Sequence, residues 1–248
     1  MTAVIVVPCF NESERWNMDY WREMLSLPGV RWLFVNDGST DGTLPLLEET
    51  ARLGSAEVLD LNPNGGKAEA VRRGLLQAVN GSELIEAVGF MDADGAFNPA
   101  DVADLLTSYR AHTASPEEFD AVWSSRVALA GRDIRRSTSR HYIGRVVATF
   151  VSMGQTDMPY DTQSGLKLFR SSTTLRGCLE VPFQTRWLFE LELIARWKSL
   201  APSPMRIWEE PLNYWHDIPG SKITMRESAR ILGELLTVKR AQHRSLKA

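Results

Sequence analysis

Acidic side chains follow three separate apolar runs in the first hundred residues. Glu12, Asp37 and the pair Asp92 and Asp94 each come just after a short stretch rich in aliphatic and aromatic residues. Such stretches are typical of buried parallel strands, and the carboxyl ends of parallel strands meet at one edge of a sheet, where ligands bind. We therefore expect these carboxylates to lie close together. Because like charges repel, a cluster of this kind requires a cation or a ligand rich in hydrogen-bond donors.

Asp92 and Asp94 form an Asp-x-Asp triplet that is suited to metal binding. Two carboxylates at this spacing point to the same side if the backbone is still extended there. Their hard oxygens suit Mg²⁺ or Mn²⁺, which also bridge diphosphate oxygens and stabilise charge on a departing nucleotide diphosphate. The alternative is that both residues form the turn before Gly95, since Asp and Gly favour turns.

Two polar loops add groups that suit a nucleotide. The loop Asn36–Thr43 contains Asp37, whose carboxylate can accept hydrogen bonds from a base or a ribose. The loop Asn62–Lys67 offers backbone N–H groups and the Lys67 ammonium to a phosphate. Each loop also has a simpler interpretation, because the first is typical of a turn followed by a helix cap and a lysine at a helix start is commonly just solvated. The second loop is not a Walker P-loop, since it lacks the upstream glycine and the Ser or Thr after the lysine.

The elements that must position these groups alternate along the first half of the chain. Apolar runs predict strands at Ala3–Val7, Trp32–Val35, Glu57–Leu61, Ala87–Met91 and Asp120–Trp123. Spacing and capping residues predict a helix capped by Ser13 and running to Leu25, a helix at Lys67–Val79, and a helix from the Asn98 cap to Tyr109. This alternation favours an α/β fold with a mostly parallel, doubly wound sheet.

The second half of the chain is less regular. Its pattern predicts helices at Arg140–Met153, Arg186–Trp197 and Thr224–Lys239, strands at Leu166–Phe169 and Arg206–Glu209, and a polar connection at Gly131–Ser139. The last helix has an apolar stripe opposite basic residues. That pattern is explained by packing on the domain, with contact with a membrane interface as the alternative.

Composition limits the class of protein. The chain has 248 residues, of which 44% are hydrophobic and 24% charged, and we expect a single domain over residues 1–248. The net charge of −3 provides no basic field for nucleic acid. Two cysteines fit a reducing compartment, and no apolar run reaches the ~18 residues needed to span a bilayer. We therefore expect a cytoplasmic protein, with a peripheral position on the cytoplasmic face of the membrane as an alternative.

Four motifs together resemble those of family 2 glycosyltransferases. They are P-x-F-N-E, N-D-G-S-T-D-G-T, G-K-x-x-A-V-R-x-G and D-A-D-G, found in the order of the family at Pro8–Glu12, Asn36–Thr43, Gly66–Gly74 and Asp92–Gly95. The resemblance implies the GT-A fold, a mostly parallel, Rossmann-like sheet with helices on both faces. It also implies a nucleotide-sugar-binding half at about residues 1–115 and an acceptor-binding half at about residues 116–248.

Three segments of the second half narrow the resemblance to the dolichyl-phosphate β-glucosyltransferase branch. Asp161–Phe169 is similar to its D-T-Q-x-G-x-K-L-F segment, Arg186–Leu193 to its R-W-x-F-D-x-E-L helix, and Ile218–Ile223 to its I-P-G-S-K-I segment. The branch implies metal-dependent, inverting transfer of glucose from UDP-glucose to a polyprenyl phosphate. Asn36 and Glu190 depart from the branch, which has Asp at both positions.

The resemblance also implies roles for particular residues. The nucleotide pocket would comprise Pro8, Cys9, Asn11, Glu12, Asp37, Lys67 and Asp92. Asp94 would coordinate the Mg²⁺ or Mn²⁺ directly, with Asp92 near the ribose and the metal. The donor sugar and the acceptor would contact Arg126, Gln163, Ser164, Trp187, Glu192 and Lys222, of which Arg126 and Lys222 would bind phosphate. If the acceptor is a hydroxyl, the candidate bases are Glu190, Glu192 and Asp161. Only one of the two glutamates can then serve, because they point to different faces of a helix.

Three other functions are open at this point. The same donor chemistry on a hydroxyl of a soluble small molecule or glycan is favoured by the polar stretch Gly131–Thr149. A nucleotidyltransferase would share the sheet, but the Gly-rich loop and following Arg of that class are missing after Val7. A non-catalytic protein that binds a nucleotide sugar would need the pocket without any turnover.

Overall fold

A computed structural model describes residues 2–81, 85–114, 119–135, 158–201, 203–216 and 233–234 of the chain. These residues form a seven-stranded sheet in the order β3-β2-β1-β4-β7-β5-β8 and a two-stranded sheet of β6 and β9. The strands are β1 Ala3–Cys9, β2 Val30–Asp37, β3 Ala56–Leu61, β4 Ala87–Met91, β5 Ala121–Ser125, β6 Asp133–Arg135, β7 Leu166–Arg170, β8 Ile207–Pro211 and β9 Tyr214–His216. In the large sheet only the pairings of β7 are antiparallel. The predicted α/β fold with a mostly parallel sheet is therefore confirmed.

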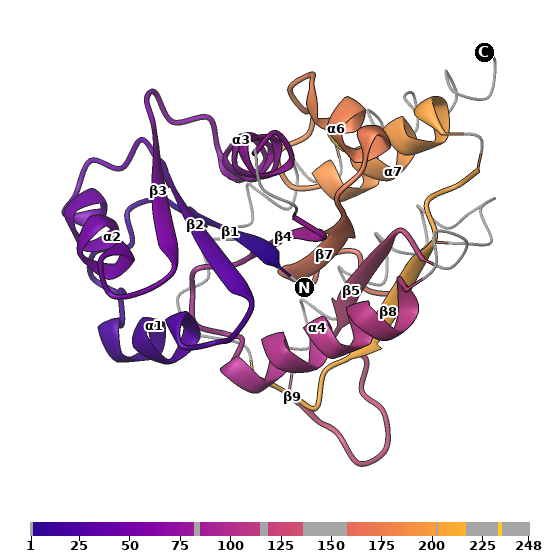
Figure 1. Ribbon diagram of the computed structural model, residues 1–248, viewed down its shortest axis with the longest axis horizontal. Helices are drawn as coiled ribbons and strands as arrows, with labels where there is room; N and C mark the ends of the chain where they lie inside the picture. The colour runs from indigo at the N-terminus through magenta and orange to yellow at the C-terminus, as the bar shows by residue number, and fades with distance from the viewer. Residues whose placement is uncertain are drawn as a thin grey trace.

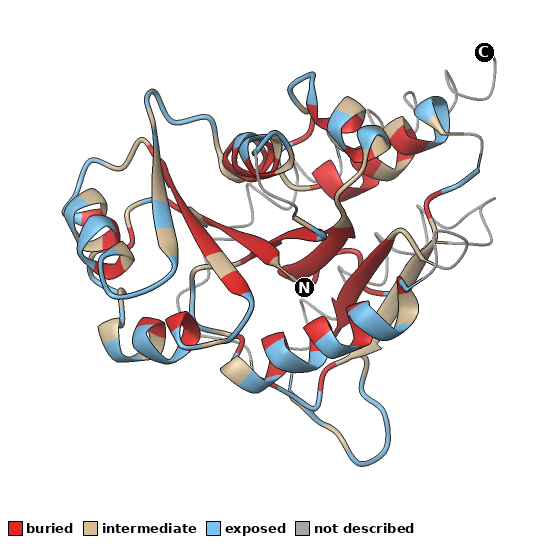
Figure 2. Cartoon of the chain, in the orientation of Figure 1, coloured by how far each residue is buried: buried red, intermediate tan, exposed pale blue. Residues whose placement is uncertain are grey.

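Helices cover both faces of the large sheet (Figure 1). They are α1 Met18–Leu25, α2 Thr43–Ala51, α3 Lys67–Val79, α4 Pro99–His112, α6 Thr173–Leu179 and α7 Phe189–Leu200. Side chains of β1 alternate between the two layers, because Ile5 packs in the cluster that includes α1 and α4, whereas Val6 packs in the cluster that includes α3, α6 and α7. Both faces of the central strands are thus buried, as in other parallel sheets (Figure 2).

A glycine in the middle of helix α3 faces the sheet without a side chain between them. A Cβ at Gly74 would collide with a methyl group of Val6 and would lie 3.0 Å from Cγ2 of Val35. The missing side chain lets the helix backbone approach β1 and β2 directly. The N-terminal end of α3, which carries Lys67, is thereby fixed relative to the strand ends.

Elements with strong local signals agree with the predicted bounds. The helix predicted at Lys67–Val79 is α3, and the strand predicted at Ala87–Met91 is β4. Asn98 caps α4 as predicted, and its side chain and that of Asp101 form a reciprocal capping box.

The first helix begins later than predicted. Asn17, not Ser13, is the N-cap of α1, and its side chain accepts hydrogen bonds from the N–H groups of Asp19 and Tyr20. The hydroxyl of Ser13 instead donates to the carboxylate of Asp41 at 2.6 Å. Ser13 therefore joins two loops rather than starting a helix.

Other differences lie in the second half of the chain. The helix predicted at Arg186–Trp197 begins only at Phe189, and β6 lies within the predicted polar connection. The sequence patterns did not indicate α6 or β9. The helix predicted at Arg140–Met153 lies outside the described residues, as does the segment Ile218–Ile223 with Lys222, and only residues 233–234 of the predicted last helix are described.

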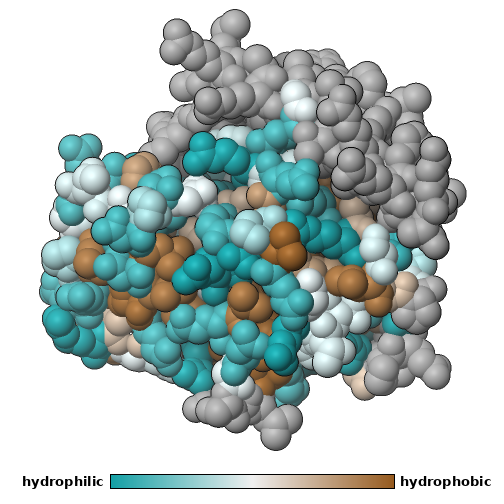
Figure 3. Space-filling view, turned by 90° about the horizontal axis from the view of Figure 1, so that it is seen from above, coloured by the Kyte–Doolittle hydropathy of each residue, from teal (hydrophilic) through white to brown (hydrophobic). Residues whose placement is uncertain are grey.

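In the described part of the chain, no helix is both long enough and apolar enough to cross a membrane. On the face seen in Figure 3, hydrophobic residues form small patches among hydrophilic ones.

Candidate active site

A cleft of about 380 Å³ opens where β1, β2 and β4 reach their carboxyl ends, beside the start of α3. This is the edge at which doubly wound sheets bind their ligands. The predicted site residues that line the cleft are Pro8, Cys9, Glu12, Asp37, Lys67, Asp92, Asp94 and Trp187. The carboxylates from three different strand ends therefore come together in one place, as the sequence predicts.

Asp37 shapes the loop that leads into α3. Its carboxylate accepts hydrogen bonds from the backbone N–H groups of Gly65 and Gly66 and from the side-chain amide of Asn64, each at 2.8 Å. The residue is only 2% exposed. Burial raises the pKa of Asp37, and the two backbone donors oppose that rise. Asp37 thus borders the cleft while its carboxylate holds the loop that carries Lys67.

Lys67 and Asp92 form an ion pair in the floor of the cleft. The Lys67 Nζ lies 2.5 Å from Oδ1 of Asp92 and 6.0 Å from the centroid of the Phe90 ring. Burial lowers the pKa of Lys67, but the negative charges of Asp92 and Glu190 outweigh burial and raise it. The ammonium therefore stays charged, at a position where it can reach a ligand phosphate.

Asp94 is more exposed than Asp92 and stands nearer to solvent. Its Oδ1 accepts a hydrogen bond from the N–H of Ala96 at 3.1 Å. Desolvation in the cleft and the negative charge of Asp92 raise the pKa of Asp94.

Among the described residues, no group of three or more acidic, histidine or cysteine side chains is placed to hold a metal ion. A cation at this edge would therefore need oxygens from its ligand in addition to Asp92 and Asp94, which is the usual arrangement for Mg²⁺ with a phosphate ligand.

The charge of the cleft supports the same conclusion. Among the described residues that line it, five are acidic and three are basic. The acidic residues are Glu12, Asp37, Asp92, Asp94 and Glu234, and the basic residues are Arg15, Lys67 and Arg186. A diphosphate entering such a cleft would meet net negative charge, so the residues present fit a bound divalent cation.

Gly165 provides the space in which the Asp92 side chain lies. The N–H of Asp92 donates to the carbonyl oxygen of Gly165 at 2.9 Å, across the pairing of β4 with the antiparallel β7. A Cβ at Gly165 would lie 2.5 Å from Cγ of Asp92 and would collide with its Oδ2. Any side chain here must therefore displace the carboxylate.

We expect Gly165→Ala to lower turnover by about 10²-fold, because a displacement of about 1 Å at a catalytic group has an effect of that size. Steady-state kinetics with matched thermal denaturation would measure it. Gly42→Ala is the control, since a Cβ there would make only an ordinary contact of 3.8 Å with Ser13. Full activity of Gly165→Ala would show that the position of Asp92 does not matter for turnover.

Glu190 and Lys167 form a buried ion pair behind the cleft. Glu190 is 4% exposed and Lys167 is 0% exposed, and Nζ of Lys167 lies 3.2 Å from Oε1 of Glu190. The ammonium also donates to the carbonyl of Ser164 and lies over the rings of Phe90 and Trp123. Burial lowers the pKa of Lys167, and Glu190 partly opposes this. Within the described part of the chain, Oε2 of Glu190 has no hydrogen-bond partner, so this oxygen can still accept a proton or a bond.

Arg126 and Asp161 bind each other. Nε and Nη2 of Arg126 lie 2.7 and 2.8 Å from the two carboxylate oxygens of Asp161, and the backbone N–H of Arg126 also donates to it. The guanidinium lies 5.2 Å from the centroid of the Trp215 ring. The two opposite charges of this bidentate pair compensate each other. Asp161 is therefore held as a partner of Arg126, which makes it a poorer candidate base than Glu190.

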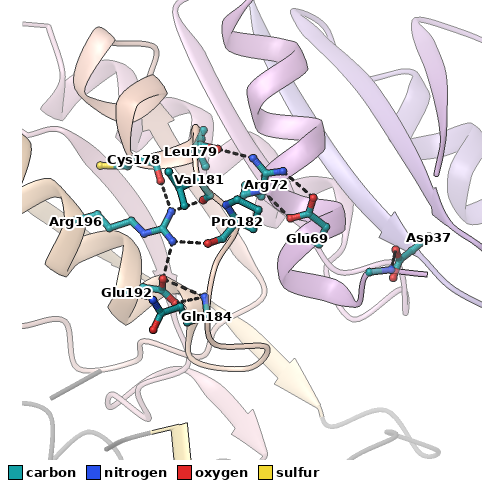
Figure 4. A network of polar contacts seen from close by, with 11 residues as sticks. Asp37, Glu69, Arg72, Cys178, Leu179, Val181, Pro182, Gln184, Glu192 and Arg196 are labelled. Carbon is teal, nitrogen blue, oxygen red and sulfur yellow. Dashed lines mark hydrogen bonds and ion pairs between the residues drawn. The ribbon is translucent and has the colours of Figure 1, made fainter. Parts of the chain in front are cut away.

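Glu192 belongs to a network with Arg196 and the loop before α7 (Figure 4). Its carboxylate accepts hydrogen bonds from the N–H groups of Gln184 and Thr185 and from the Thr185 hydroxyl. Nη2 of Arg196 donates to it at 2.7 Å. Glu192 thus fixes the loop before α7, and Glu190 is the glutamate of this helix that remains a candidate base.

The other predicted residues have structural partners. The Asn11 side chain accepts from the N–H of Thr40 and so links β1 to the next loop. The Ser164 hydroxyl lies 2.5 Å from that of Ser124. Cys9 is buried, and burial, with a contribution from Glu12, raises the pKa of its thiol. The side chain of Gln163 donates to the carbonyl of the preceding residue.

Several residues of the cleft have no role predicted from the sequence. They are Phe10, Arg15, Asn64, Arg186 and Glu234. Arg186 begins the segment Arg186–Leu193, in which Trp187, Glu190 and Glu192 are the predicted site residues. Arg15 binds Glu12 at 2.5 Å. The sequence gives no indication of a role for Glu234, because it is one charged residue in an amphipathic pattern. Its contacts are with residues more than forty positions away.

The chain is similar to known glycosyltransferases over most of its length. The family model described as glycosyl transferase family 2 matches residues 4–156. The sequence is 30% identical over 237 residues to a dolichyl-phosphate beta-glucosyltransferase of Drosophila melanogaster, covering 89% of this chain and 68% of that protein. It is 30% identical over 199 residues to a dolichyl-phosphate beta-glucosyltransferase of Dictyostelium discoideum, covering 77% of this chain and 56% of that protein.

Solved structures share the fold. Glucosyl-3-phosphoglycerate synthase of Mycobacterium tuberculosis in complex with phosphoglyceric acid superposes with a TM-score of 0.65 at 19% identity, covering 96% of this chain and 79% of that one. The complex of the same enzyme with Mn²⁺ and UDP-glucose has a TM-score of 0.64 at 18% identity, covering 96% and 78%. At this level of identity the likeness concerns the fold alone.

Proposed function

The chain belongs to glycosyl transferase family 2, and from this premise we propose that it transfers glucose from UDP-glucose to a polyprenyl phosphate, with inversion at the anomeric carbon. The observation that carries the proposal is the cleft at the carboxyl edge of the sheet. There Asp92, Asp94 and Lys67 lie together beside the N-terminal end of α3. Backbone donors and a lysine at a helix start suit the phosphates of a nucleotide.

The donor side of the proposal includes a divalent cation held by Asp92 and Asp94, either Mg²⁺ or Mn²⁺. When bound, it would stabilise the negative charge that develops on the departing nucleotide diphosphate. Lys67 would add a second positive charge to the same oxygens, and the Asp37-held loop would keep that lysine in place. The complex of the structurally similar synthase with Mn²⁺ and UDP-glucose supports this choice of cofactor and donor.

The acceptor side rests on the relatives named dolichyl-phosphate beta-glucosyltransferases, which match most of the chain. A phosphate acceptor is already an anionic nucleophile, so no strong base has to remove a proton from it. Such an acceptor lies in a membrane, which supports a peripheral position on the cytoplasmic membrane face. Arg126, which is already bound to Asp161 through Nε and Nη2, would be the residue that binds the acceptor phosphate.

One observation favours a second candidate, transfer to a hydroxyl of a soluble molecule. Glu190 is buried next to the cleft, and its Oε2 has no hydrogen-bond partner among the described residues. A hydroxyl acceptor needs a carboxylate to take its proton, and Glu190 would be that base.

Labelled substrate separates the two candidates. The protein is incubated with UDP-[¹⁴C]glucose and Mg²⁺, with either a polyprenyl phosphate or a delipidated cell extract as acceptor. We expect label in the organic phase of the first reaction. Label only in the aqueous products of the second would contradict the polyprenyl acceptor and favour a hydroxyl, whereas label in neither would contradict the choice of donor.

A further inference from the structure

Helix α7 has no cap from its own N-terminal residues. Leu188 is at the N-cap position and offers no side-chain acceptor. The first N–H groups of a helix need acceptors, and the positive end of the helix dipole favours a carboxylate there. Glu234, from far along the chain, places a carboxylate at this end, where it binds the N-cap residue Leu188 and the two residues before it. Its Oε1 accepts from the N–H of Arg186 at 3.0 Å, and its Oε2 from those of Trp187 and Leu188 at 3.0 and 3.1 Å.

The backbone that Glu234 holds forms one wall of the cleft. Arg186, Trp187 and Glu234 all line it. The Arg186 guanidinium lies across Gly66, where a Cβ would come within 2.8 Å of Nη2. Gly66 in turn donates its N–H to Asp37. The wall beside α7 is thus in contact with the loop that carries Lys67 on the opposite side.

The same anchor affects the first turn of α7. Glu190 lies in that turn, two residues after Leu188, and its carboxylate binds Lys167 behind the cleft. A shift of residues 186–188 would therefore move both the wall of the cleft and the start of the helix that bears Glu190.

We propose that Glu234 is a positioning residue for the donor site, which holds Arg186 and Trp187 in place as the wall that contacts the nucleotide. Both of its oxygens accept backbone hydrogen bonds. Its proposed role is therefore to hold the backbone, whereas that of Asp94 is to bind a metal ion. Its bonds to three successive N–H groups are charge-assisted, and therefore stronger than those of a neutral acceptor. The identity of the ligand rests on the proposed function, whereas the anchoring of residues 186–188 does not.

Variants of Glu234 test this role in the full-length protein. We expect Glu234→Ala to raise the KM for the donor about tenfold and to weaken UDP binding by a similar factor. Calorimetry with UDP in the presence of Mg²⁺ measures the binding. The change in the KM for the acceptor should be smaller than the change in the KM for the donor. Hydrogen exchange of the amides of residues 186–188 should accelerate in the absence of any ligand. Glu234→Gln keeps one acceptor oxygen and should be intermediate. Glu180→Ala, at the exposed C-terminal cap of α6, is the control and should match the wild type.

Two results would overturn the proposal. One is amide exchange and UDP affinity within twofold of the wild type in Glu234→Ala. The other is a fall in kcat at constant donor KM, because loss of folded protein alone has that effect. If the wild-type protein itself fails to bind UDP, the proposed donor is wrong, and amide exchange in the ligand-free protein still decides whether Glu234 anchors this segment.

Discussion

Asp94→Asn is expected to lower kcat by about 10²–10³-fold and to leave the fold intact, which is the usual effect of removing one group that stabilises transition-state charge. Asn keeps the size and the Ala96 contact of Asp94 but removes the charge that would hold a cation against a diphosphate. Added Mn²⁺ should not restore turnover, because the missing ligand is a protein atom. The measurement is kcat with UDP-glucose at increasing Mg²⁺ and Mn²⁺, beside circular dichroism of each variant.

The matched control is Asp19→Asn on the exposed side of α1, where the carboxylate forms a surface ion pair with Arg22. This variant should retain wild-type turnover. Recovery of the Asp94→Asn variant at high Mn²⁺ would mean that Asp94 is not a required metal ligand.

Lys167→Met is expected to lower the free energy of unfolding by about 3–5 kcal/mol, the range found when one partner of a buried ion pair is removed. Met fills a similar volume between the rings of Phe90 and Trp123, so packing changes little. The large effect arises because Glu190 would be left charged and buried without its partner. Urea unfolding followed by tryptophan fluorescence measures the change.

A double variant distinguishes this explanation from a packing defect. Lys167→Met combined with Glu190→Gln removes the stranded charge and should regain much of the lost stability. Lys198→Met, at an exposed position of α7, should have little effect. If the double variant is less stable than Lys167→Met alone, the loss comes from packing and not from charge.

Local features of the sequence were sufficient for β4, for α3 and for the capped start of α4. Apolar runs, the Asn98 cap and the start of α3 at Lys67 depend on neighbours a few residues away, so the bounds of β4 and α3 agree with prediction. The edge of the sheet at which the cleft lies could also be predicted, because parallel strands direct their carboxyl ends to one side. That rule alone brought Glu12, Asp37, Asp92 and Asp94 together.

Contacts between distant segments decided what each carboxylate does. In the sequence Asp37, Asp94 and Glu190 are equivalent acids, but one holds a loop, one faces the open cleft, and one lies buried against a lysine. Ser13 does not cap α1, because Asp41, 28 residues away, binds its hydroxyl. Local patterns carry no information on such partners, since the partner of a polar group is chosen by packing and desolvation in the folded chain. For the same reason only the tertiary structure revealed that Gly165 makes room for Asp92 and that Glu234 anchors the start of α7.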